Sequence, residues 1–187
     1  MLDGLGILNR GRLFTPKTTH PLMDLPNQII TTQIKAGEHP SSMAGKAKII
    51  INVQSLPHEK DEFGLGGHVK REVEAHVAAI CQAAPYLRAH PARMEWILDA
   101  DCAEVSPDHP FVAAFQGAVA TAGLSPTLSG FGAHSDMGLP TGLGQTPTVN
   151  FGPGDPAQSH QPNEKVSVRD LVDCTKAIAL AIEGWCG

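Results

Sequence analysis

The last twenty residues of the chain follow the spacing of an amphipathic α-helix, and this feature constrains the fold most. From position 168 to position 185, apolar side chains recur every three or four residues, which places them on one face of a helix. Ser167 is a favourable N-cap, and Asp170 three residues later is close to a capping box. The pattern predicts a closing helix with one apolar face, made by Val168, Leu171, Val172, Thr175, Ile178, Ala179, Ile182 and Trp185.

Two runs in the first half of the chain predict neighbouring β-strands. Residues 28–35 form a short β-branched run that ends before Gly37 and Pro40, which is typical of a strand followed by a turn. In residues 46–56 apolar and polar side chains alternate up to Pro57. One face of this second strand is therefore apolar, as expected for a sheet that helices cover on one side.

Three further elements are expected between these strands and the Gly-rich region. The spacing of apolar residues over 69–81 predicts an amphipathic helix packed on the sheet. Alternation over 94–98 predicts a third strand. A short helix is expected after Pro110, where proline is tolerated in a first turn, and it should bury Phe111, Phe115 and Val119 before ending at Gly123.

The order of these elements indicates an α/β protein in two parts. Residues 1–27 show no helical or strand period and are interpreted as a connector. Residues 28–124 would form a first domain with too few strands to close a good sheet alone. In residues 125–187, a short apolar run over 148–151 is expected to be a buried strand that feeds a Gly-Pro-Gly loop before the closing helix.

Composition excludes several classes of protein. The net charge is −5 and the basic residues are scattered, so a nucleic-acid partner is not expected. No stretch has the length and apolar character of a signal peptide or a membrane span, so we expect a cytoplasmic protein without a membrane partner. The four cysteines are widely spaced and contain no Cys-x-x-Cys pair, which favours buried free thiols over a zinc clip or redox site.

The segment from 132 to 164 carries most of the residues that could take part in binding or catalysis. A strand that ends in Gly-Pro-Gly-Asp and is followed by a loop histidine resembles an active-site rim, because ligands in α/β sheets gather beyond the carboxyl ends of strands. The neutral imidazole of His160 is a plausible zinc ligand. A single surface histidine is more often simply solvated, and local features leave both interpretations open.

The order of motifs in this segment resembles a known family. Ser-Asp-Met, Thr-Pro-Thr-Val, Phe-Gly-Pro-Gly-Asp and His-x-Pro-Asn-Glu occur in that order before a helix that opens with Val-Ser-Val-Arg-Asp-Leu. This order is similar to the C-terminal signature of the dinuclear-zinc deacylases and exopeptidases, which include acetylornithine deacetylase, succinyl-diaminopimelate desuccinylase and glutamate carboxypeptidase. The turn over 35–45 between the two expected strands is similar to the lid domain of the same family. Together these motifs cover nearly the whole chain.

The resemblance implies roles for particular residues. His160 would bind one of two zinc ions, for which cobalt is a possible substitute. Ser135 and Asp136 would lie at the substrate pocket, although a turn capped by the aspartate explains the same dipeptide equally well. Gly152 and Gly154 would let the backbone approach ligand and metal, or would simply form a turn.

Two positions in the first half depart from the family pattern. His39 lies in the lid turn where relatives often carry Asn, so a substrate contact is possible, but a solvated turn histidine is the favoured interpretation. Gln54 stands where many relatives have an Arg that holds the substrate carboxylate. Since Gln cannot form the charged fork, the substrate class is left open.

The fold implied by the resemblance is most of a ferredoxin-like lid, followed by the last strand and helix of a zinc-peptidase-like catalytic domain. The implied function is hydrolysis of an N-acyl amino acid or a similar amide, by a homodimer that associates through the lid.

The general base and the remaining metal ligands of the family lie upstream of these motifs. In the family the general base belongs to a Glu-Glu pair, and this chain has no such pair. Its His134-Ser135-Asp136 has the letters of the family's His-x-Asp metal motif, but it follows Gly and Ala instead of closing an apolar strand. We therefore interpret this match as coincidental. No catalytic residue is therefore expected in this chain, which would be a C-terminal fragment.

Two other functions stay open. The chain could be a catalytically inactive fragment or pseudoenzyme that acts only through its lid interface, since unpaired strands offer exposed edges. Alternatively, the whole protein could be a dipeptidase or carboxypeptidase of the same family.

Overall fold

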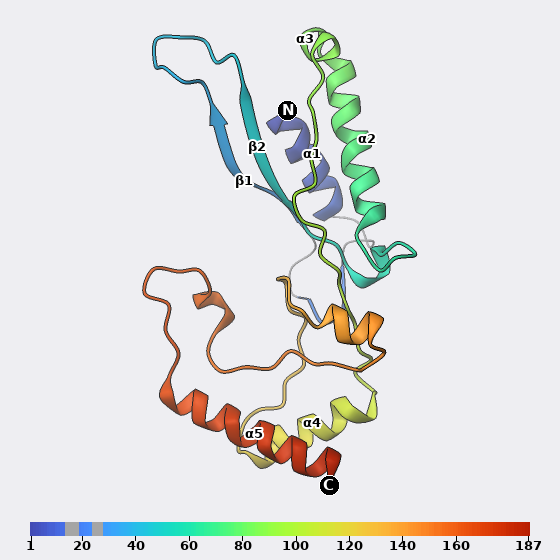
Figure 1. The fold of residues 1–187 in the computed structure, drawn as a ribbon, viewed down its shortest axis with the longest axis vertical. Helices are drawn as coiled ribbons and strands as arrows, with labels where there is room; N and C mark the ends of the chain where they lie inside the picture. The colour runs from blue at the N-terminus through green and yellow to red at the C-terminus, as the bar shows by residue number, and fades with distance from the viewer. Residues whose placement is uncertain (14–18, 24–27) are drawn as a thin grey trace. The chain divides into compact units, whose positions relative to one another are not determined.

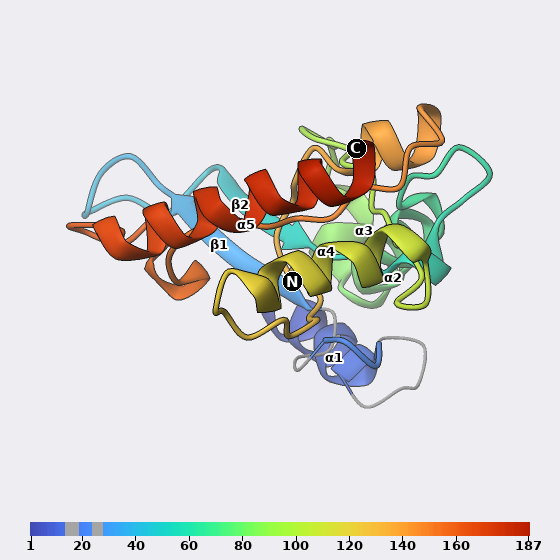
Figure 2. The same ribbon diagram turned by 90° about the horizontal axis from the view of Figure 1, so that it is seen from below.

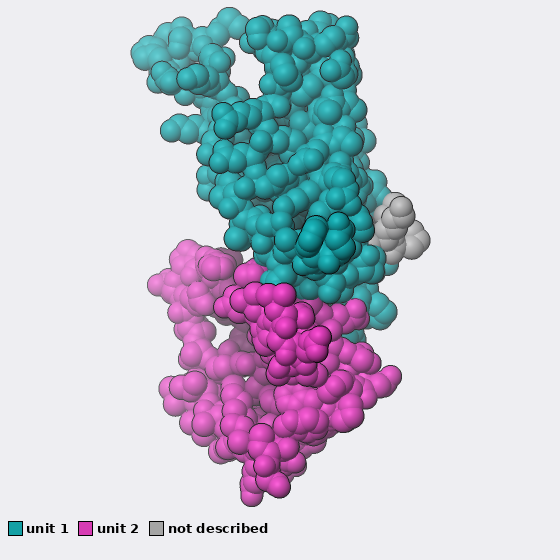
Figure 3. Space-filling view, turned by 45° about the vertical axis from the view of Figure 1, so that its right-hand side comes forward, with its two compact units in different colours: residues 1–102 teal, residues 103–187 magenta. Residues whose placement is uncertain are grey.

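The computed structural model describes residues 1–13, 19–23 and 28–187. The chain divides into two compact units, Met1–Cys102 and Ala103–Gly187, which Figure 3 distinguishes by colour. None of the helices in the described ranges is both long enough and apolar enough to cross a lipid bilayer.

Unit 1 contains one β-hairpin with helices packed on it (Figure 1). Its strands pair antiparallel with Ile29 opposite Val53, and the register shifts once, between Thr31 and Gln33. Gly37 begins the connecting turn at a φ of 74°, a conformation that glycine adopts without steric cost. The elements in the described part of this unit are α1 (Leu2–Leu13), β1 (Ile29–Ala36), β2 (Ala47–Val53), the 3-10 turn η2 (Pro57–Glu59), α2 (Gly67–Ala83) and α3 (Pro85–Ala89).

The core of unit 1 forms along one face of α2. The side chain of Val73 is fully buried, and it lies in a cluster with Leu5 of α1 and Ile29 of β1. The helical spacing that predicted α2 is confirmed, because its buried residues are Val69, Val73, Val77 and Cys81. The predicted strand pair is confirmed as well, with Ile51 and Val53 packed against the same cluster.

Helix α1 is the main difference from the sequence interpretation of residues 1–27. Leu2–Leu13 is helical instead of an irregular connector, whereas positions 14–18 and 24–27 of that segment lie outside the described residues. The helix has glycines and no strong apolar stripe, so its periodicity gave no signal. Gly4 allows close packing against α2, since a Cβ at this position would lie 2.4 Å from Cδ1 of Ile80. Tertiary contacts therefore stabilise α1 where local propensity does not.

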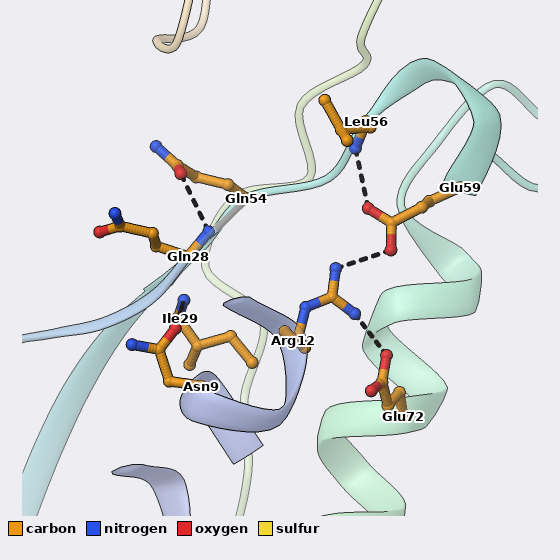
Figure 4. Close-up of polar contacts among 8 residues, drawn as sticks. All are labelled: Asn9, Arg12, Gln28, Ile29, Gln54, Leu56, Glu59 and Glu72. Carbon is orange, nitrogen blue, oxygen red and sulfur yellow. Dashed lines mark hydrogen bonds and ion pairs between the residues drawn. The ribbon is translucent and has the colours of Figure 1, made fainter. Parts of the chain in front are cut away.

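A buried cation fastens α1 to the elements around it. Only 4% of Arg12 is exposed, its Nη2 lies 2.6 Å from Oε1 of Glu59, and its Nη1 pairs with Glu72 of α2 (Figure 4). The other oxygen of Glu59 accepts a hydrogen bond from the backbone N–H of Leu56 at 3.0 Å. The side chain of Asn9 accepts the N–H of Ile29 at 2.8 Å, which joins α1 to the start of β1. The ion pairs of Arg12 and the hydrogen bond of Asn9 together attach α1 to η2, α2 and β1.

The third predicted strand, over 94–98, is wrong for this chain. No residue from 91 to 105 belongs to a helix or strand. Trp96 does pack on the core, as the alternation indicated, but side chains hold the segment: its Nε1 donates to Glu74 at 2.6 Å, and Lys70 lies 5.3 Å from its ring centroid. Lys70 also pairs with Asp99. Alternation reports which side faces the core, whereas a strand also needs a hydrogen-bonded neighbour.

Unit 2 is built on two helices that lie side by side in Figures 1 and 2. The rings of Phe111 and Trp185 meet edge to face at 5.3 Å between centroids, and those of Phe115 and Phe151 at 5.1 Å. Gly123 follows the first helix at a φ of 82°, as expected for a C-terminal stop. The elements are α4 (Pro110–Thr121), the π-helical turn η3 (Leu139–Leu143), the 3-10 turn η4 (Pro156–Gln158) and α5 (Val168–Cys186).

Two sequence-based boundaries differ from the structure in this region. The sequence interpretation placed the domain boundary after residue 124, but the units meet at Cys102–Ala103 and α4 belongs with α5. The aromatic contacts of α4 explain this, because they are made to residues of unit 2. The run over 148–151 has no strand assignment either. The observed class is a mixed helical protein with a small two-stranded antiparallel sheet, which is compatible with α/β.

The Arg12 contact generates the first prediction. Arg12→Ala should lower the free energy of unfolding by about 3 kcal/mol, because it leaves the largely buried carboxylate of Glu59 without its cation. Urea denaturation followed by circular dichroism measures the change. Arg10→Ala is the matched control, since Arg10 is an exposed arginine of the same helix. Equal stability of the two variants would contradict the role of Arg12.

Candidate functional site

The loop that leads from the Gly-Pro-Gly bend to α5 is held by a succession of tight turns. Asp155 caps η4, and its Oδ1 accepts the N–H of Ala157 at 2.9 Å. Backbone N–H groups then donate to the carbonyl three residues earlier at 158, 159, 161 and 164, over 2.9 to 3.2 Å. The loop is thus locally ordered although almost all of it is exposed.

His160 has an unusual backbone in this loop. Its φ is 62°, in the left-handed region, and Asn163 has the same value. Residues other than glycine are uncommon there, and His and Asn are among those that tolerate it best. The N–H of His160 donates to Oε2 of Glu164 at 3.1 Å, and the residue is exposed. The conformation is fixed by the loop, while the imidazole is not buried in apolar surroundings.

The two glycines of the bend differ from each other. Gly154 has a φ of 92°, and a Cβ there would lie 3.2 Å from Cγ2 of Val166, so both backbone and space favour glycine. At Gly152 an added Cβ would have nothing within 4 Å. The turn therefore explains Gly154, whereas nothing in the described packing requires glycine at 152.

Ser135 and Asp136 lie just before η3. The carbonyl of Asp136 accepts the N–H of Leu139 at 3.2 Å, which is a turn contact. Asp136 is exposed and Ser135 is half-buried. None of the hydrogen bonds or ion pairs among the described residues joins either of them to His160. The dipeptide thus lies at a turn held by its backbone, and both the capping role of the aspartate and the substrate role stay predictions.

His39 and Gln54 of unit 1 both make hydrogen bonds within that unit. Nδ1 of His39 accepts the N–H of Ser41 at 3.1 Å within the exposed hairpin turn. Oε1 of Gln54 accepts the N–H of Gln28 at 3.2 Å, and the N–H of Gln54 donates to the carbonyl of Gln28 at 3.1 Å (Figure 4). Gln54 therefore extends the pairing of β1 and β2, a structural role that the sequence interpretation missed.

The described residues do not form a complete metal centre. Across the ranges that the structure describes, no three His, Cys, Asp or Glu side chains are grouped so that they could hold a metal ion. A zinc site with protein ligands usually has at least three of them. His160 supplies one candidate ligand, so the residues that the structure describes do not fit a whole zinc site.

Unit 2 also has an open pocket of about 350 Å³. Its lining carries no ionisable group, which makes it unsuitable for acid–base chemistry. The residues that line it are Phe111, Phe115, Pro147, Thr148, Val149, Phe151 and Ile178.

The left-handed His160, on an ordered and exposed loop after a Gly-Pro-Gly bend, is the candidate ligand that the resemblance to a class of metal-dependent hydrolases singled out. Comparison with known sequences agrees with this class. Residues 19–184 match the model of peptidase family M20/M25/M40, and the chain belongs to that family.

Three curated relatives are named as hydrolytic enzymes. N-formyl-4-amino-5-aminomethyl-2-methylpyrimidine deformylase from Halalkalibacterium halodurans is 29% identical over 182 residues, which covers 86% of this chain and 38% of the relative. The enzyme of the same name from Bacillus subtilis is 28% identical over 176 residues, with the same two shares. A putative LysW-lysine/LysW-ornithine hydrolase from Pyrobaculum aerophilum is 28% identical over 155 residues, covering 83% of this chain and 39% of the relative. The chain thus spans well under half the length of these relatives.

The helix that follows the loop generates the second prediction. The hydroxyl of Ser167 accepts the N–H groups of Arg169 and Asp170 at 3.2 and 3.4 Å, which confirms it as the N-cap of α5. Ser167→Ala should therefore lower the free energy of unfolding by about 1 kcal/mol and speed amide exchange in the first turn of α5. Ser159→Ala, in the preceding loop, is the control for the substitution itself. A stability change at Ser159 as large as that at Ser167 would refute the capping role.

Proposed function

We propose that the chain is part of a metal-dependent hydrolase that cleaves linear amide bonds, with N-acyl amino acids as the substrate class. The observation that carries this proposal is the family match over residues 19–184. The names of the relatives support it, since two are deformylases of an N-formyl compound and the third is a putative hydrolase of a LysW-linked amino acid. The acetylornithine deacetylase type is our preferred member of this class.

We assign His160 as a metal ligand, with zinc as the metal, two ions in the complete enzyme and cobalt as a possible substitute. The exposed imidazole and the ordered left-handed backbone support this assignment, because a preset ligand loses less conformational entropy on binding. A metal bound there would polarise the amide carbonyl. The other ligands and the general base would come from polypeptide outside this chain.

The same proposal gives substrate contacts to Ser135, Asp136, His39 and the glycines of the bend. Open space around Gly152 supports a close approach of ligand to backbone at that position. The exposed carboxylate of Asp136 and the exposed ring of His39 are accessible to a small molecule. Their hydrogen bonds to neighbouring residues are compatible with a second role.

Unit 1 would serve as the lid, as an incomplete ferredoxin-like domain through which two copies associate. Its element order of helix, strand, strand and helix, followed by the extended segment at 94–98, supports this interpretation. In the same proposal, unit 2 is the C-terminal portion of the catalytic domain.

The absence of a three-ligand group in the described residues favours a second candidate, in which this chain alone is catalytically inactive and acts through its interface. Dipeptidase and carboxypeptidase activity remain alternatives within the same family. The side-chain amide of Gln54 is engaged by Gln28, so it provides no charged contact that would select a substrate carboxylate.

The purified 187-residue chain should show no chelator-sensitive hydrolysis of N-acetyl or N-formyl amino acids or of dipeptides. The physical reason is that one imidazole cannot fix a metal ion, and the described residues offer no group of three ligands around it. Product formation with added zinc, measured with and without a chelator, tests this. Turnover that disappears on chelation would overturn the assignment of the missing groups to other polypeptide.

In a complete enzyme that contains this chain, His160→Ala should lower kcat/KM for amide hydrolysis by at least about 100-fold and reduce bound zinc, because a direct ligand is lost. His90→Ala is the control, since His90 is an exposed histidine whose ring packs on Tyr86 at 4.8 Å. Unchanged zinc content and activity in the His160 variant would remove the basis of the metal assignment.

A further inference from the structure

The loop over 154–166 is closed at its base by a close contact. A Cβ at Gly154 would lie 3.2 Å from Cγ2 of Val166, so the backbone of the bend approaches this side chain just before α5 begins. Compact loops whose ends lie close together are frequently functional. The loop contains the His-x-Pro-Asn-Glu motif at 160–164, of which only the histidine has a role in the proposed function. The contacts of the other motif residues therefore carry information that the function does not yet use.

Two consecutive turns in this loop have the same backbone pattern. The turns over 158–161 and 161–164 are each closed by a hydrogen bond from the last N–H to the first carbonyl, at 3.1 and 3.2 Å. The third residue has a φ of 62° in both, and it is His160 in the first turn and Asn163 in the second. Turns of type II need a positive φ at their third residue and favour Gly or Asn there. The histidine thus occupies a position that the turn itself would fill with another residue type.

The two turns differ in how well their residues suit them. In the second turn, Pro162 presets the φ of the second position and Asn163 tolerates the left-handed third position. In the first turn, glycine would adopt the φ of His160 without steric cost, whereas a residue with a Cβ is strained there. Surrounding contacts must offset that strain. The imidazole is therefore at position 160 for its chemistry and not for the turn.

Glu164 makes the side-chain contact that holds this backbone. Its Oε2 accepts the N–H of His160 at 3.1 Å, while the second turn fixes the backbone of Glu164 itself. A hydrogen bond to a charged acceptor is stronger than one between neutral groups. The torsion φ relates the N–H of a residue to its side chain, so a fixed N–H direction and a fixed φ together set the direction of the Cα–Cβ bond. The carboxylate thereby determines where the exposed ring of His160 starts from the backbone.

We propose that Glu164 is a positioning residue for His160. Its carboxylate holds the left-handed backbone that aims the imidazole, and it needs no contact with metal or substrate to do so. This inference rests on the proposed function, in which His160 is a metal ligand. A ligand whose direction is fixed before binding loses less conformational freedom when it binds, and partners that orient a ligand histidine raise metal affinity for this reason.

Amide exchange in the 187-residue chain, measured by NMR, tests the contact itself. Glu164→Ala should speed exchange of the His160 N–H by at least about fivefold, because the charged acceptor is lost. Glu164→Gln keeps an acceptor oxygen on a side chain of the same length, so it should speed exchange by about twofold at most. Lys165→Ala, at the exposed neighbouring residue, is the matched control and should leave the rate unchanged. Equal rates in Glu164→Ala and the unmodified chain would overturn the proposal.

Zinc affinity in a complete enzyme that contains this chain tests the purpose of the contact. Glu164→Ala should weaken zinc binding by about tenfold, as expected when a ligand loses its orienting partner. Excess zinc should restore occupancy in this variant, whereas it should not in His160→Ala, where the ligand itself is absent. Glu164→Gln should bind zinc within about threefold of the unmodified enzyme. A glutamate with a merely structural role would change stability and leave zinc affinity as it was.

The failure of this inference and the failure of the proposed function give different results. Loss of zinc in His160→Ala with unchanged affinity in Glu164→Ala would overturn the positioning role alone. Equal zinc loss in Glu164→Gln and Glu164→Ala would make the carboxylate itself a ligand, which also overturns it. Full zinc binding by His160→Ala would refute the metal assignment, and with it the purpose of the contact, even where the exchange rates confirm that Glu164 holds the backbone.

Discussion

Extended backbone becomes a strand only when a neighbour satisfies its N–H and C=O groups, and this constraint shapes both units. β1 and β2 satisfy each other and form the only sheet among the described residues. The segment over 94–98 has strand-like alternation and a packed Trp96, but the side chains of Glu74 and Lys70 hold it in place of a ladder. The run over 148–151 has no strand assignment and makes no backbone–backbone hydrogen bond within the described residues, although the ring of Phe151 packs on Phe115. Both segments have the sequence of a strand and lack its partner.

The same constraint explains how much of the fold the sequence predicts. The hairpin and helices α2, α4 and α5 follow local periodicity, and their positions agree with the patterns that indicated them. Helix α1 does not, because its stability comes from Arg12 and Asn9 contacting residues 20 to 60 positions away. The boundary between the units escaped prediction for a related reason. The aromatic partners of α4 lie 36 to 74 residues further along the chain, at Phe151 and Trp185, and no local pattern reports them.

For the candidate site, the sequence identified candidate residues, but it did not predict their backbone geometry. It singled out His160 from its motif, yet the left-handed backbone at 160 and 163 is set by the turns of the loop and by the bond to Glu164. Gly152 and Gly154 belong to one motif, but they differ in the structure. Only at position 154 does a positive φ favour glycine over other residues. Gln54 illustrates the opposite case. Its family position suggested substrate chemistry, whereas its contacts show a residue that continues the hairpin pairing.

The position of His160 depends on how the two ends of its loop are held. The loop leaves the run over 148–151 at Gly152 and enters α5 at Ser167. At the first end, the ring of Phe151 packs on Phe115 of α4, and at the second, the hydroxyl of Ser167 caps α5. Contacts that fix the separation of the loop ends reduce the conformational freedom of the histidine between them. Ligand geometry tight enough for metal binding requires such support from rigid elements. The pairing of α4 with α5 would therefore support the imidazole from both ends of its loop.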